Sequence, residues 1–105
     1  MGKNKNLIAQ LKEFKKEISK SMHLDNMIFF GSKAEGTGSK HSDVDLIIVS
    51  NKFNKIRPLE RGLDLYDHWN VDSPVDFLCY TPEEFKKAVK RIGLAAEAAK
   101  NGIVI

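Results

Sequence analysis

A run of aliphatic residues in the middle of the chain, Val44-Asp45-Leu46-Ile47-Ile48-Val49, restricts the fold more than any other feature. Its richness in β-branched side chains favours a β-strand. Two further apolar runs, residues 27–30 and 75–80, are expected to form strands as well, and residues 103–105 are a candidate for a last strand. Because helical patterns lie between these runs, the sequence predicts a small α/β sheet layered with helices.

The helices are predicted from the spacing of their apolar residues. The first carries one apolar stripe, formed by Leu7, Leu11, Phe14, Ile18 and Met22, and its lysines are assigned to the solvent side. Residues 58–66 are expected to form a helix that Pro58 opens, with Leu59, Leu63 and Tyr66 on one face. Residues 94–100 are expected to form an alanine-rich helix.

The segment after the third predicted strand has a strong helix start. Thr81 can cap the helix and Glu84 can complete a capping box. Phe85, Val89 and Ile92 are then expected to face inward.

Size and charge limit the classes of function. The 105 residues, 42% of them hydrophobic, suit one domain covering residues 1–105, and so short a chain is expected to borrow surface from a second copy or another protein. A net charge of +3 gives little support for nucleic-acid binding. The lone Cys79 excludes an internal disulfide framework. With no apolar run of roughly 18 residues and no signal-peptide pattern, we expect no membrane span and a cytoplasmic location.

Two aspartates at the mouth of the central predicted strand are unexpected, because aspartate is depleted in strands. Asp43 and Asp45 would point to the same face, roughly 6.6 Å apart. At an effective dielectric constant near 20, two such charges repel each other by about 2.5 kcal/mol. A divalent cation such as Mg²⁺ would offset this cost. In the alternative interpretation one aspartate caps a turn and the other pairs with Lys33 or Lys40.

Asp76 is the third carboxylate in an apolar setting, within Val75-Asp76-Phe77-Leu78. A lone carboxylate there is expected to be desolvated, and costly unless it is paired. The 31 residues between Asp45 and Asp76 can hold a loop and a connecting helix, so the three carboxylates could converge from neighbouring strands. Three carboxylates suit a two-metal site for phosphoryl transfer.

Gly31-Ser32 follows the first predicted strand and opens a helical turn. Backbone N–H groups and a hydroxyl at such a point can bind an anion. A plain turn is the alternative, and the P-loop ending Gly-Lys-Ser/Thr is absent.

Together these motifs resemble the minimal nucleotidyltransferase group of the DNA polymerase β-like superfamily. The matching segments are Phe29-Phe30-Gly31-Ser32-Lys33-Ala34, Gly36, residues 42–49 and Val75-Asp76-Phe77. The resemblance implies a small mixed sheet of three to four strands backed by helices. It also implies transfer of a nucleoside monophosphate, with AMP from ATP expected, to a hydroxyl group.

The same resemblance assigns the site residues. Gly31 and Ser32 would hold the triphosphate of ATP or another nucleotide. Asp43, Asp45 and Asp76 would hold Mg²⁺, or Mn²⁺ in its place, with Asp76 assisting the incoming hydroxyl. Many members of the group are antitoxins paired with a HEPN-domain toxin, and some transfer AMP to a toxin tyrosine. Such a toxin is the expected protein partner.

One position departs from the family pattern: Glu35 stands where the family commonly has arginine. An anion near the phosphates would weaken triphosphate binding unless Lys33 or Lys40 compensates. The second hypothesis is therefore a partner-binding module with weak catalysis. Among the remaining polar residues, His41 is expected at the surface, and His68 and Trp69 are expected in packing or partner contacts. Arg57 and Arg61 are expected on a solvated face rather than against a phosphate or an acidic partner.

Overall fold

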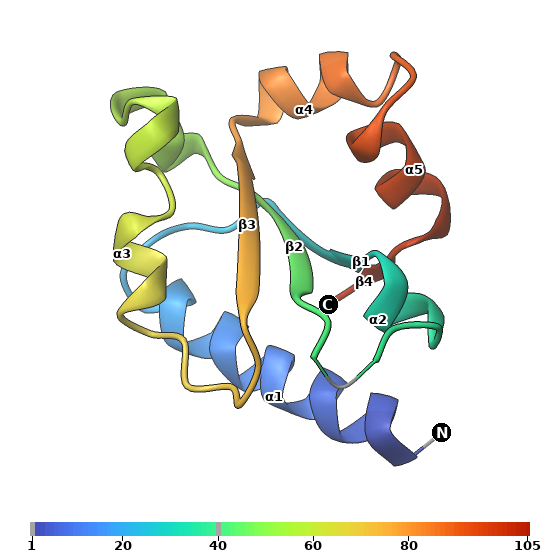
Figure 1. The fold of residues 1–105 in the computed structure, drawn as a ribbon. Helices are drawn as coiled ribbons and strands as arrows, with labels where there is room; N and C mark the ends of the chain where they lie inside the picture. The colour runs from blue at the N-terminus through green and yellow to red at the C-terminus, as the bar shows by residue number, and fades with distance from the viewer. Residues whose placement is uncertain (1, 40) are drawn as a thin grey trace.

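The structure is a computed structural model that describes residues 2–39 and 41–105, with side chains from residue 6 onward. Its elements, in chain order, are α1 (Gly2–Ser19), β1 (Asn26–Phe30), α2 (Ser32–Glu35), β2 (Val44–Val49), two 3₁₀ turns (η1, Asn51–Lys55, and η2, Pro58–Glu60), α3 (Leu63–Tyr66), β3 (Val75–Tyr80), α4 (Pro82–Ala88), α5 (Leu94–Asn101) and β4 (Ile103–Val104). The predicted strands and the alternation with helices are confirmed, including the short last strand (Figure 1). None of the helices in the described part of the chain has the length and apolar content that a membrane span requires.

The four strands form one mixed sheet in the order β3-β2-β1-β4. β1 pairs antiparallel with β2 and with β4, whereas β2 and β3 run parallel. The end of β1 and the starts of β2 and β3 consequently lie together at one end of the sheet. The mixed sheet expected from the resemblance is confirmed.

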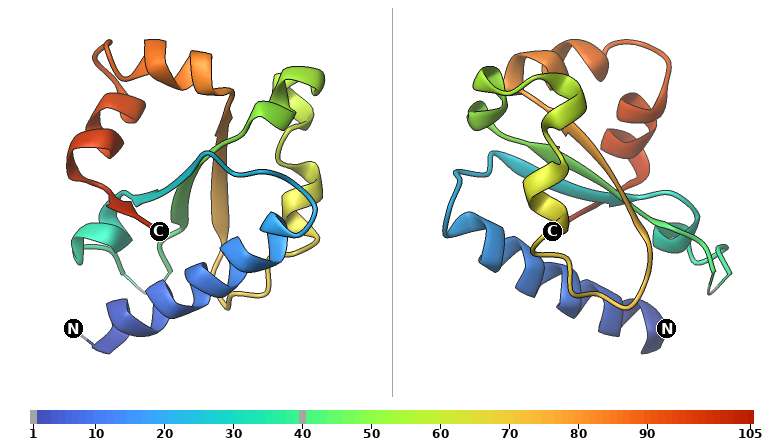
Figure 2. Two further views of the ribbon diagram at one scale, coloured as in Figure 1. Left: turned by 180° about the vertical axis from the view of Figure 1, so that it is seen from behind. Right: turned by 60° about the vertical axis from the view of Figure 1, so that its left-hand side comes forward.

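Each face of the sheet has its own apolar core, because successive side chains in a strand point to opposite faces. On one face, Leu11, Phe14 and Ile18 of α1 pack against alternate strand residues that include Phe29 and Leu46. On the other face, α5 packs Ala95 and Ala98 against a second set of strand residues: Ile28, Phe30, Ile47 and Val49. Figure 2 shows α1 and α5 on opposite sides of the sheet.

The packing role expected for Trp69 is confirmed. Its ring meets Phe14 edge-on at 5.0 Å between centroids and Phe77 at 5.8 Å. The indole Nε1 donates to the carbonyl oxygen of Ser73 at 2.8 Å, so the polar atom of this half-buried ring is satisfied.

The prediction of one helix over residues 58–66 is wrong in detail. A 3₁₀ turn and a one-turn α-helix replace it, separated at Gly62. The apolar stripe faces solvent: Leu59 is 95% exposed, and Leu63 and Tyr66 are also exposed. The break at Gly62 resets the helical phase, so that Leu65 instead of the stripe enters the core.

Arg61 is buried, with 7% exposure, which contradicts its assignment to a solvated face. Its guanidinium forms a bidentate ion pair with Glu84, at 2.6 and 3.3 Å. It also donates to the carbonyl oxygens of Ile56 and Cys79. Four acceptors compensate the desolvation of the cation, which ties the segment after β2 to the start of α4.

The helix after β3 begins as predicted and ends early. Thr81 and Glu84 form the capping box, with Glu84 N donating to Thr81 Oγ1 at 3.1 Å. The helix ends at Ala88, so Ile92 lies beyond it and is fully exposed instead of facing inward. Phe85 and Val89 do pack against the second core.

Candidate functional site

Two of the predicted carboxylates stand directly opposite each other. In the parallel ladder between β2 and β3, Asp45 is the register partner of Asp76. On its other side Asp45 pairs with Phe30, the last residue of β1, so Gly31 and Ser32 follow next to it. At this end of the sheet, the predicted Gly31-Ser32 turn thus lies beside Asp45 and Asp76.

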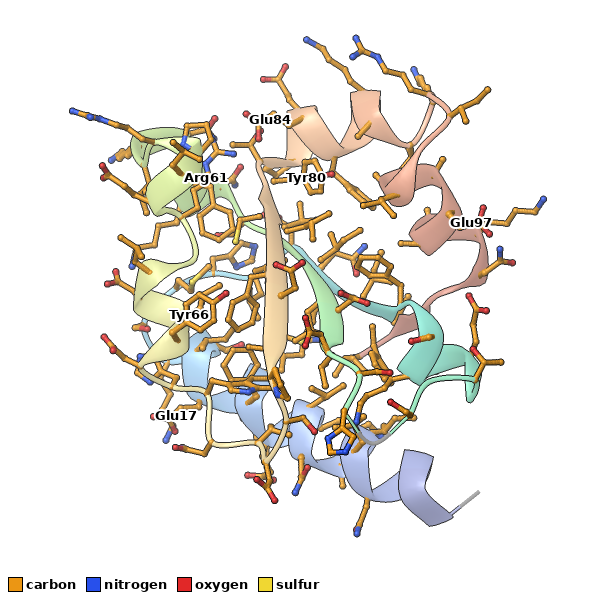
Figure 3. The ribbon with its side chains drawn as sticks, viewed as in Figure 1. Glu17, Arg61, Tyr66, Tyr80, Glu84 and Glu97 are labelled. Carbon is orange, nitrogen blue, oxygen red and sulfur yellow. The ribbon has the colours of Figure 1, made fainter. Side chains whose placement is uncertain are left out.

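Asp45 and Asp76 share the face of the sheet that α5 covers. Val44 and Leu46 point into the α1 core, so the intervening Asp45 points to the opposite face. Asp76 alternates in the same way between Val75 and Phe77, which pack against the α1 core. Figure 3 shows the side chains of the molecule, with Glu97 labelled on α5, the helix that covers this face. A shift of either strand by one residue would separate the pair.

Burial and repulsion act together on Asp45. Burial raises the pKa of the Asp45 carboxyl, and the negative charges of Asp76 and Asp43 raise it further. The electrostatic cost expected from the sequence is therefore concentrated on the middle carboxylate of the three. Excess negative charge of this kind attracts a cation.

Asp76 is exposed, which corrects the expectation that it would be desolvated. The physical reason is that β3 is an edge strand, with one side open to solvent. Asp43 is also exposed and lies immediately before β2. Neither Asp43 nor Asp45 forms an ion pair with Lys33 in the described residues, and Lys40 lies outside them.

The absence of a side chain at Gly31 lets the backbone pass close to the Asp45 carboxylate. Its φ of 88° and ψ of −169° belong to a region that is essentially restricted to glycine. A Cβ atom at this position would overlap Asp45 Oδ2 and lie 3.3 Å from Asp45 Cγ. The turn continues into α2, whose first residue, Ser32, is exposed at the start of the helical turn.

A cleft of about 200 Å³ opens between this end of the sheet and α5. The residues that line it are Phe30, Gly31, Glu35, Asp45, Asp76, Leu78, Leu94, Glu97, Ala98, Asn101 and Gly102. The α5 wall was not predicted from the sequence, because an alanine-rich helix carries no local sign of what it faces. Gly102 allows the close approach: a Cβ there would lie 2.6 Å from Ile28 Cγ2.

The donor chemistry of the site fits a hard divalent cation, since carboxylate oxygens are the ligands that Mg²⁺ prefers. Asp45 and Asp76 face each other across one ladder position, and Asp43 adds a third charge. The arrangement is nevertheless open: across residues 2–39 and 41–105, no three acidic, histidine or cysteine side chains lie close enough to hold one ion together. The strand register brings Asp45 and Asp76 together, and the metal-binding role of Asp43, Asp45 and Asp76 stays a prediction from the sequence.

Comparison with known proteins places the chain among nucleotide-transferring domains. Residues 8–93 match the family model described as "Nucleotidyltransferase domain". A Methanocaldococcus jannaschii protein named "Putative protein adenylyltransferase" is 29% identical over 86 residues, which cover 80% of this chain and 84% of that protein. The crystal structure of a "putative nucleotidyltransferase" from Sulfolobus solfataricus superposes with a TM-score of 0.67 at 19% identity, covering 94% of this chain and 78% of that one. This likeness shows a shared fold.

Proposed function

The chain belongs to the nucleotidyltransferase domain family, and from this premise we propose that it transfers AMP from ATP to a hydroxyl group in a reaction that depends on Mg²⁺. The observation that carries the proposal is the register of Asp45 against Asp76 beside the Gly31-Ser32 turn. This register places an acidic pair beside the Gly31-Ser32 turn at one end of the sheet.

The proposed reaction is a displacement at phosphorus. The hydroxyl oxygen of the acceptor forms a bond to the α-phosphorus of ATP, and the bond from that phosphorus to the bridging oxygen of the β-phosphate breaks. Pyrophosphate leaves, and the hydroxyl proton passes to a carboxylate or to water. When bound, Mg²⁺ would neutralise charge on the phosphate oxygens.

Each residue has a proposed role in this scheme. Gly31 and Ser32 bind the triphosphate through backbone N–H groups and the serine hydroxyl. Asp43 and Asp45 hold Mg²⁺. Asp76 completes the metal site and, because it is the exposed member of the pair, lies where an incoming hydroxyl can reach it.

A protein hydroxyl is the proposed acceptor. The name of the M. jannaschii relative, which describes a protein adenylyltransferase, supports this choice. The exposed position of Asp76 on an edge strand also supports it, since a large acceptor needs an open approach. A HEPN-domain toxin is the proposed partner, with a toxin tyrosine as the modified residue.

Calorimetry with Mg-ATP and a transfer assay with ATP labelled at its α-phosphate test the proposal. Asp43→Asn and Asp45→Asn are expected to lose nucleotide binding, whereas Asp76→Asn is expected to lose label transfer. Asp67→Asn is the matched control, because Asp67 is an exposed aspartate outside the cleft lining. Unchanged affinity in both of the first two variants would contradict the proposal.

A second candidate function is a partner-binding module with a weak active site. Glu35 favours it, because this carboxylate lines the cleft together with Asp45, Asp76 and Glu97. Four carboxylates around one cleft oppose a triphosphate. A stable complex with the protein encoded by a neighbouring gene, without label transfer at any metal concentration, would support the module. Gain of transfer in Glu35→Arg would identify the glutamate as the cause.

A further inference from the structure

The surface between α4 and α5 combines positive charge with exposed apolar side chains. We define this α4–α5 surface by the residues Lys86, Lys87, Lys90, Arg91, Ile92 and Leu94. All six are exposed. In Figure 1, α4 lies beyond the end of β3 and α5 continues from it along one face of the sheet, so the turn between them forms a rim of the molecule.

The four cations of this surface have no acidic partner within ion-pair distance among the described residues. The neighbouring Glu84 is held by Arg61, so Glu83 is the remaining anion of α4. With Glu97 and Lys100 of α5 included, five cations stand against the two anions that Arg61 does not hold, an excess of +3 over residues 82–101. Charge of one sign gathered on one rim steers an oppositely charged partner.

Two large aliphatic side chains interrupt this charge. Ile92 is fully exposed, and Leu94 is 61% exposed. They lie on either side of Gly93, which has a φ of 154°. The space around Gly93 is open, since a Cβ atom at that position would have no neighbouring residue within 4 Å. Exposed apolar anchors surrounded by charge are typical of a docking surface between proteins.

The α4–α5 surface runs into the candidate active site. Leu94 lines the cleft together with Asp45 and Asp76, so a chain lying on Ile92 and Leu94 would reach the acidic pair directly. The surface and the cleft are therefore continuous.

We propose that the α4–α5 surface docks an acidic polypeptide segment of the acceptor protein and leads its hydroxyl into the cleft. Acidic side chains of the segment would pair with the four cations, and apolar side chains would cover Ile92 and Leu94. A nucleic acid is the less suitable occupant, because no aromatic side chain interleaves with these cations to stack on bases. This inference rests on the proposed function for its acceptor, but docking itself needs no catalysis.

Fluorescence anisotropy tests the docking with a labelled peptide in which glutamates alternate with leucines around a single tyrosine. Wild-type protein is expected to bind the peptide at low salt, with affinity that falls as salt rises. Lys87→Glu/Lys90→Glu is expected to weaken binding by about tenfold or more, and Ile92→Ser by a smaller factor.

Matched controls are available elsewhere in the chain. Lys12→Glu/Lys16→Glu makes the same charge change on exposed residues of α1, and Leu59→Ser removes an equally exposed aliphatic side chain. Both controls are expected to bind the peptide as wild type does. Equal losses in test and control variants would overturn the proposal. So would tighter binding of an oligouridylate probe that the same α4–α5 variants abolish.

Calorimetry with Mg-ATP on the same variants separates this inference from the proposed function. The α4–α5 variants are expected to bind Mg-ATP as wild type does. Peptide binding without any Mg-ATP binding would refute the proposed function and leave the docking surface standing. Mg-ATP binding without peptide binding would do the reverse.

Discussion

Replacing Gly31 with alanine tests the geometry of the candidate site most directly. The substitution forces an L-residue into a backbone conformation that costs about 1–3 kcal/mol. It also places a Cβ atom on Asp45 Oδ2, so the carboxylate must rotate away from its position opposite Asp76. A side chain pushed off its rotamer adds about 0.5–1.5 kcal/mol. The reduced entropy of the unfolded chain returns about 0.4–1 kcal/mol.

The midpoints of these ranges give a net loss of about 2 kcal/mol for Gly31→Ala, which a domain with a typical stability of about 5–15 kcal/mol survives. Gly93→Ala is the matched control, because Gly93 has a similar glycine-only conformation (φ 154°, ψ −170°) in open surroundings. It carries the backbone strain without the overlap, so its expected loss is about 1–2 kcal/mol.

Urea unfolding, followed through the single tryptophan, measures both losses. Calorimetry with Mg-ATP measures the effect on the site. Gly31→Ala is expected to lose nucleotide affinity while folded, and Gly93→Ala is expected to keep it. The reasoning fails if both variants bind Mg-ATP as wild type does, or if both lose affinity equally.

Three further predictions concern single side chains. Because burial, and then repulsion from Asp76 and Asp43, raise the pKa of Asp45, the folded state holds the Asp45 proton more tightly than the unfolded state does. Asp45→Asn is therefore expected to raise the urea midpoint at pH 7, and this gain should shrink as the pH falls towards 4. The hydrogen bond from Arg61 lowers the pKa of Glu84. The pair therefore stabilises the folded state at pH values above the pKa of an unfolded glutamate, and this stabilisation is lost as the pH falls through the lowered pKa. Arg61→Met is expected to cost about 1–3 kcal/mol at pH 7 in urea unfolding, because it leaves the carbonyl oxygens of Ile56 and Cys79 without their donor while Glu84, 45% exposed, stays solvated. A loss unchanged at pH 3 would contradict the contribution of the ion pair. Burial raises the pKa of the Cys79 thiol to about 12. Its labelling by iodoacetamide at pH 8 is therefore expected to be slow in the folded protein and fast in urea; rapid labelling without urea would show that β3 opens.

Local patterns in the sequence were sufficient for most of the secondary structure. The stripe of α1, the β-branched run of β2 and the Thr81 capping box each depend on residues within about one or two turns of one another. The same is true of the acidic residues, whose rarity in strands marks them as unusual without any knowledge of their neighbours.

Which face a stripe presents could not be predicted, because periodicity defines a stripe but not its partner. Leu59 and Leu63 form a regular stripe, yet the break at Gly62 and the pairing of Arg61 with Glu84, 23 residues away, turn that stripe to solvent. The helical spacing of Phe85 and Val89 continues to Ile92 in the sequence, but α4 ends at Ala88.

The sequence by itself determined the local elements and the chemical identity of the candidate site residues, since capping, strand propensity and carboxylate chemistry depend on near neighbours. Only the tertiary structure decided that Asp45 stands opposite Asp76, that α5 closes the cleft, and that Asp76 lies on an exposed edge. Strand register and helix docking arise from contacts between residues distant along the chain, and no local pattern encodes them.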